Sequence, residues 1–131
     1  MRLSFATFVV AILVCLAMPA EGHHSFAASY DGNKPVTIRG KISKLGWLNP
    51  HTHIYVDVVN QKGETATWEV ETASTIALSR AGMRREDFVG QAVIVTGFLA
   101  RDGTPTMTAS KLTLVDKNRV FSSDEASPAA R

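Results

Sequence analysis

The stretch VTIRGKISKLGW, residues 36–47, decides the fold of this 131-residue chain. From Val36 to Ile42 apolar residues alternate with polar ones, which is the pattern of a half-buried β-strand. The apolar positions then move by one residue, to Leu45 and Trp47, and this change indicates a β-bulge near Lys44. Because a bulged strand bends, we expect this strand to serve two sides of a barrel.

The segments that follow predict four more strands and one helix. Strands are expected at 53–58, 65–71, 92–100 and 107–115, with a turn at 61–64 and an Asp102-Gly103 hairpin signal before the last strand. Residues 74–81 have helical composition, with Thr72 or Ser74 as the N-cap and Gly82 as the stop. This order predicts an all-β protein with one short helix, a five-stranded OB-fold-like Greek-key barrel. A small split β-sandwich is the structural alternative.

Residues 1–22 have the pattern of a secretory signal peptide and are set aside from the fold. Arg2 supplies the positive start, residues 8–18 form an apolar run too short for a membrane span, and a small-residue exit follows. Cleavage after Gly22 would make His23 the first residue, whereas cleavage after Ala20 would leave Glu21 in front. The protein is therefore expected in the periplasm or secreted, with no transmembrane span in the mature chain.

The mature chain is expected to form one small domain. We assign residues 23–35 to an N-terminal segment, 36–116 to the barrel and 117–131 to a polar C-terminal tail. The only cysteine, Cys15, lies in the signal segment, so neither a disulfide nor a thiolate metal site is expected. The chain has 14 Lys and Arg against 12 Asp and Glu, mixed along its length without a basic cluster. That distribution argues against nucleic acid as a partner.

All four histidines fall in two clusters, and the first is His23-His24 at the expected processing site. If cleavage follows Gly22, the new α-amine and Nδ1 of His23 can chelate one Cu(II), and a second imidazole completes a T-shaped set. If cleavage follows Ala20, the amine, two backbone amides and His23 form a square-planar set for copper or nickel. The alternative is that the two histidines are a polar linker without a ligand.

The second cluster is His51-Thr52-His53. Residues two apart on a strand project to one face, so His51 and His53 can converge on one metal ion if the strand already includes His51. Asp57 lies on the same face and is the expected carboxylate, as a ligand or as the acceptor that orients an imidazole. The alternative is that His51 hydrogen-bonds the loop backbone and His53 faces solvent. A folded-back N-terminus would join both clusters into one metal site.

The chain shows no pattern of an enzyme. Ser25 and Ser74 lack the Gly-x-Ser-x-Gly surroundings of a serine nucleophile, and no phosphate-binding loop is found. Glu69 and Glu71 share a strand face, and we expect them to be solvent-facing polar residues. No catalytic residues are therefore predicted.

Five motifs carry a resemblance: HHSF at 23–26, DGNKPVTIRG at 31–40, WLNPH at 47–51, RAG at 80–82 and VTGF at 95–98. Together they resemble a family of small exported bacterial proteins of unknown function, which implies export but no catalytic residue. More loosely, Trp47 and Met107 resemble in type the Trp and Met ligands of the periplasmic copper chaperone of metal efflux systems, itself a small OB barrel. That protein's Met-x-Met pattern is absent, so we expect both residues in the core.

Two functions remain open from the sequence. The first is an exported metal-binding module or carrier, with copper as the favoured cofactor, His23, His24, His51 and His53 as ligands, and a metal ion or a periplasmic protein as partner. The second is a metal-free OB-type interaction domain that holds a protein or an oligosaccharide on its barrel face and the 47–53 loop.

Overall fold

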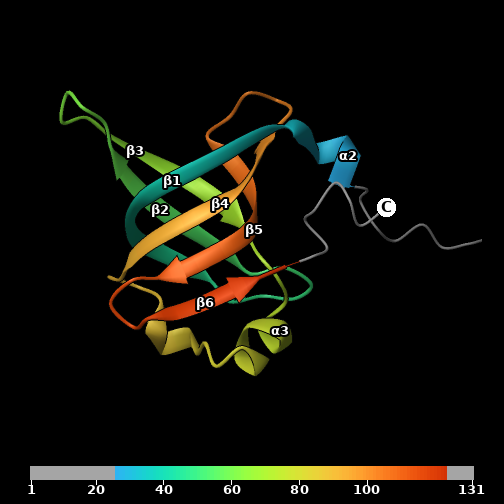
Figure 1. The fold of residues 1–131 in the computed structure, drawn as a ribbon, viewed down its shortest axis with the longest axis vertical. Coiled ribbons are helices and arrows are strands. Elements are labelled where there is room, and N and C mark those ends of the chain that lie inside the picture. The colour runs from blue at the N-terminus through green and yellow to red at the C-terminus, as the bar shows by residue number, and fades with distance from the viewer. Residues whose placement is uncertain (1–25, 124–131) are drawn as a thin grey trace, which may run out of the picture.

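The computed structural model describes residues 26–123, and the predicted signal segment, His23, His24 and the last eight residues lie outside this range. The described part contains six strands and three short helices in one sheet-based unit (Figure 1). In chain order these elements are α2 (Phe26–Ser29), β1 (Tyr30–Gly46), β2 (His53–Val59), β3 (Thr65–Glu71), α3 (Thr75–Arg80), the 3₁₀ helix η1 (Arg85–Asp87), β4 (Ala92–Ala100), β5 (Thr106–Leu114) and β6 (Arg119–Ser122).

The sheet closes on itself. Its strand order is β3-β2-β1-β4-β5-β6, and a further parallel pairing of β3 with β5 joins the two sides. The other pairings are antiparallel, and α3 lies between β3 and β4 in the chain. This is the five-stranded OB-fold barrel that the sequence predicts, with one strand added at its end.

β1 is the strand that both sides share. It pairs with β4 from Tyr30 to Lys41 and with β2 from Lys41 to Gly46. The register with β2 shifts between Ile42 and Lys44, which confirms the predicted bulge within one residue. The bend at this point turns the strand from one sheet into the next.

The barrel interior is filled by the inward-facing residues of all five strands, together with Leu78 of α3 and Met83 and Phe88 from the segment after it. Met107 is fully buried, as the sequence predicts, whereas Trp47 is partly buried and packs against the core with its ring 5.6 Å from that of Phe88. The buried cluster consists of Ile38, Ile42, Ile54, Val56, Val70, Leu78, Met83, Phe88, Val93, Val95, Met107, Ala109, Leu112 and Leu114.

The helix α3 covers one end of the barrel (Figure 1). Its N-cap is Ser74, whose hydroxyl accepts a hydrogen bond from the Ala77 amide at 3.2 Å. Gly82 follows with φ of +78°, a conformation that glycine adopts without a steric penalty. The helix therefore begins at the predicted N-cap, Ser74, and ends before the predicted stop, Gly82.

The C-terminal boundary of the barrel was predicted too early. Residues 117–131 were expected to be a polar tail, but Arg119–Ser122 forms β6, which pairs with β5 from Lys111 to Leu114. Phe121 is paired with Leu112 and packs on the core. One inward residue in a short polar segment gives too little alternation to predict a strand. β1 likewise begins at Tyr30, six residues before the predicted start.

None of the helices formed by residues 26–123 has the length and apolar character needed to cross a membrane.

Gly97 should be a sensitive position, because its strand passes very close to β5. A Cβ atom at Gly97 would overlap the carbonyl oxygen of Thr108. We expect Gly97→Ala to lower the free energy of unfolding by about 1–3 kcal/mol, as overpacking does. Gly46→Ala is the matched control, since its Cβ would lie 3.6 Å from the nearest atom, and we expect a change of less than about 0.5 kcal/mol. Urea denaturation of both variants measures this, and equal stability would contradict the close packing.

Candidate functional site

The outer face of β2 and β3 carries a row of polar side chains. Across the antiparallel pair, His53 lies opposite Glu71 and Tyr55 lies opposite Glu69. The residues between them, Ile54 and Val70, point inward and are fully buried. The alternation that builds the core therefore places two basic or aromatic groups and two carboxylates on one outer surface.

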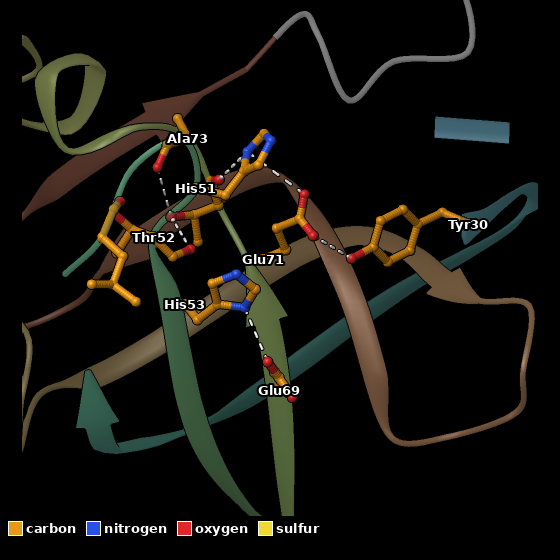
Figure 2. Close-up of polar contacts among 9 residues, drawn as sticks. Tyr30, His51, Thr52, His53, Glu69, Glu71 and Ala73 are labelled. Carbon is orange, nitrogen blue, oxygen red and sulfur yellow. Dashed lines mark hydrogen bonds and ion pairs between the residues drawn. The ribbon is translucent and has the colours of Figure 1, made fainter. Parts of the chain in front are cut away.

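His53 is paired with a carboxylate of the neighbouring strand. Its Nδ1 atom lies 3.0 Å from Oε1 of Glu69, diagonally across the strand pair (Figure 2). The Tyr55 hydroxyl donates a longer hydrogen bond, 3.5 Å, to the same oxygen. On its other side, the Tyr55 ring has the Lys44 ammonium 4.8 Å from its centre.

His51 lies in the loop before β2, and that loop is fixed by Thr52. The Thr52 amide donates to the Ala73 carbonyl at 3.0 Å, and the Thr52 carbonyl accepts from the Thr72 amide at 2.8 Å and the Thr72 hydroxyl at 3.1 Å. Thr52 itself is fully buried. The backbone pairing of β2 and β3 thus continues past the strand ends and carries His51 with it.

One ring nitrogen of His51, Nδ1, lies near two oxygen atoms. It lies 3.3 Å from the Thr72 carbonyl oxygen and 3.6 Å from Oε1 of Glu71 (Figure 2). A carbonyl oxygen only accepts hydrogen bonds, so Nδ1 carries the hydrogen when this bond is made. In the neutral ring, Nε2 then holds the free electron pair, and within residues 26–123 neither His51 nor His53 has a polar contact through Nε2.

Tyr30 connects this row to the start of the barrel. Its hydroxyl donates a 2.8 Å hydrogen bond to Oε2 of Glu71, the carboxylate whose other oxygen faces His51 (Figure 2). Burial of Tyr30 raises the pKa of its hydroxyl well above the ordinary value of 10.0, and the hydrogen bond to Glu71 and the negative charges nearby raise it further. Tyr30 is therefore a hydrogen-bond donor over the whole neutral range.

Two of the four predicted metal ligands lie in the described part of the chain, and the carboxylates beside them are not the predicted one. His51 and His53 lie on one end of the β2-β3 face, whereas His23 and His24 are outside the described residues. Asp57, the predicted partner, instead accepts hydrogen bonds from Ser43 at 3.1 Å and Thr67 at 2.7 Å. The carboxylates beside the imidazoles are Glu69 and Glu71, which the sequence interpretation left as solvent-facing residues.

Within residues 26–123, no group of three or more His, Cys, Asp or Glu side chains is arranged to hold a metal ion. The sequence did contain a signal for the observed row of side chains. His53 and Tyr55 are two residues apart on one strand, as are Glu69 and Glu71 on the next, so each pair was expected to share a face. Which residue of one strand lies beside which residue of the other depends on the strand register, and neither strand alone determines that register.

Comparison with known proteins places the chain in a sequence family. The model of a family of unknown function, DUF6152, matches residues 10–109. A search of curated proteins found no match.

Two solved structures are similar in fold. The dimeric N-terminal domain of the PriB protein from Thermoanaerobacter tencongensis is 18% identical, with a TM-score of 0.47 over 63% of this chain and 97% of that one. The structure of yeast Stn1 and Ten1 contains a chain that is 16% identical, with a TM-score of 0.41 over 62% of this chain and 42% of that one.

The hydrogen bond from Tyr30 to Glu71 should be measurable as stability. We expect Tyr30→Phe to lower the free energy of unfolding at pH 7 by about 1–2 kcal/mol, because the bond has a charged acceptor. Tyr55→Phe is the control, since its hydroxyl makes only a long hydrogen bond of 3.5 Å, and we expect less than about 0.5 kcal/mol. Chemical denaturation measures both.

The same tyrosine should make the protein sensitive to alkali. The pKa of Tyr30 is raised above 10.0 in the folded state, so the unfolded chain loses its proton first as the pH rises. The stabilisation is complete below pH 10 and declines above it. Thermal unfolding at a series of pH values should show this decline, and Tyr30→Phe should make it shallower than Tyr55→Phe does. An equal decline in both variants would contradict the role of Tyr30.

Proposed function

The chain belongs to the family of unknown function DUF6152, and we propose that it is a small exported metal-binding module whose fixed ligands are His51 and His53. One observation carries the proposal: each imidazole directs Nδ1 to oxygen acceptors on β3 or the segment that follows it, which leaves Nε2 as the ligand atom. Metal-binding histidines commonly have this arrangement, in which a carboxylate or carbonyl holds the other ring nitrogen.

The remaining ligands in this proposal are His23, His24 and the new α-amine. The described chain starts beside the face that carries His51: Phe26 has its ring 5.9 Å from that of Tyr30, and Tyr30 contacts Glu71. His24 is two residues before Phe26, a stretch that spans at most about 7 Å. An all-nitrogen set of imidazoles and an amine suits Cu(II), which is why copper is the favoured metal.

Copper should stabilise the folded protein if the site combines both clusters. A ligand that binds only the folded state raises the free energy of unfolding, by about 2.7 kcal/mol at a free concentration of 100 Kd. We expect one equivalent of Cu(II) to raise the melting temperature of the mature chain, and His51→Gln/His53→Gln to abolish the rise. Calorimetry and intact mass measure stability, stoichiometry and the N-terminus together.

The complementary variant is His23→Ala/His24→Ala, which keeps the barrel histidines but lacks two of the proposed ligands, so we expect it to lose the rise as well. An N-terminal peptide site that binds copper equally in folded and unfolded chains would not shift the melting temperature. Copper retention without any shift, or a shift that survives His51→Gln/His53→Gln, would contradict the combined site.

The carboxylate behind His53 should matter for affinity without being a ligand. We expect Glu69→Ala to weaken copper binding by about 10–100-fold, as loss of such a supporting acceptor does. Glu64→Ala is the matched control, because Glu64 lies in the β2-β3 turn and accepts a hydrogen bond from Asn60. Titration calorimetry measures both, and equal affinities would contradict the role of Glu69.

The metal-free interaction domain remains the second candidate, favoured by one feature of the end where α3 lies. Leu48 is 62% exposed and Ile76 is 57% exposed, although both are large and apolar. The Asn49 side chain joins their segments, accepting hydrogen bonds from the Thr75 amide and hydroxyl at 3.2 and 2.9 Å. Exposed aliphatic groups on neighbouring segments are typical of protein contact surfaces.

A further inference from the structure

A half-open surface hollow lies at the end of the barrel away from α3. The β4-β5 loop lies at this end, and α3 covers the opposite one (Figure 1). The hollow has a volume of about 310 Å³, at the lower limit of pockets that hold small ligands. The residues lining it that matter here are Lys34, Trp68, Leu99, Arg101, Thr104 and Pro105.

Trp68 forms the apolar floor of this hollow. It lies opposite the inward-facing Val56 and two residues from the inward-facing Val70, so it belongs to the interior side of β3. The indole packs on the core yet stays partly exposed. An inward aromatic ring that opens to a hollow is a stacking surface for another ring.

The rim of the hollow is preformed. The Pro105 carbonyl accepts a 3.0 Å hydrogen bond from the Glu69 amide, which ties the β4-β5 loop to β3. Inside the loop, Thr104 donates to Oδ1 of Asp102 through its amide at 3.0 Å and its hydroxyl at 2.7 Å, and these bonds lower the pKa of Asp102. A preformed rim spares a ligand the entropy of ordering the loop.

Arg101 is anchored to the segment before β1. Its amide donates to the Ser29 carbonyl at 3.0 Å and its Nε to the Ala27 carbonyl at 2.7 Å. Within residues 26–123 its terminal guanidinium nitrogens make no hydrogen bond, so their donors remain for a ligand.

Both charged residues that line the hollow are cations. Lys34 is the second, with its side chain 64% exposed and its ammonium 3.7 Å from Asp31. Among the described residues that line the hollow there is no carboxylate. Asp31 and Asp102 belong to the same segments, but each is engaged within its own turn, by Asn33 and Lys34 or by Thr104.

We propose that this hollow binds a small organic anion with a single ring, the ring stacked on Trp68 and the anionic group held by Arg101 and Lys34. The volume suits one ring, the floor is aromatic, and the charged groups of the rim are cationic. A guanidinium recognises a carboxylate through paired hydrogen bonds, which a neutral ligand lacks. The ring can be aromatic or a sugar, and the shared chemistry is a ring that carries one carboxylate.

Two-dimensional NMR of the mature chain tests this site, since the two tryptophans give two indole N–H signals, assigned with Trp47→Phe. We expect 4-hydroxybenzoate or D-glucuronate to shift the Trp68 signal saturably and to leave that of Trp47 in place. The uncharged analogues, 4-hydroxybenzyl alcohol and D-glucose, should bind at least tenfold more weakly. The acid that binds more tightly identifies the kind of ring.

Arg101→Gln should weaken binding about tenfold, the effect of losing one charged hydrogen bond, and Arg101→Lys should restore part of it. Arg39→Gln is the control, because Arg39 is an exposed residue of β1 that does not line the hollow. Thermal unfolding confirms that each variant is folded. Absence of a saturable Trp68 shift with both acids would overturn the proposal, as would equal binding of acids and neutral analogues. If Arg101→Gln does not fold, Lys34→Gln replaces it, because the Lys34 side chain is exposed, and it should likewise weaken binding of the acids relative to Arg39→Gln.

Discussion

The barrel depends on one strand, β1, pairing with two partners. Because β1 bends between Ile42 and Lys44, its first part bonds to β4 and its last part to β2. Gly40 makes the bend possible near the crossing, since a Cβ atom there would overlap the Asp57 carbonyl oxygen. Once both pairings exist, β3 and β5 are brought close enough to pair in parallel, and the core becomes enclosed.

Closure also determines what remains on the outside. Side chains of β2 and β3 point alternately inward and outward, so their outer face collects His53, Tyr55, Glu69 and Glu71. The two ends of the barrel differ, because the chain places α3 at one end and the β4-β5 loop with the short α2 at the other. The imidazole row and the Trp68 hollow are therefore separate consequences of the same closure.

The sequence predicts the barrel better than it predicts the site. Alternation along one strand places its residues on a face, and this was enough for β3, for β4 and for the bulge in β1. The partner of His53 depends on the register between two strands, which neither strand contains by itself. Asp57 was chosen because it shares a strand with His53, whereas the residue in contact is Glu69, on the neighbouring strand.

The geometry around His51 is controlled from the first described strand. Glu71 has one oxygen bonded to Tyr30 and the other facing His51, so the position of the carboxylate depends on a tyrosine at the start of β1. Tyr30 is buried, and its raised pKa keeps it protonated as a donor. Phe26 contacts both the Tyr30 and the Phe98 rings, at 5.9 and 5.4 Å. These contacts therefore connect the segment before β1 to the loop that carries His51, through Tyr30 and Glu71.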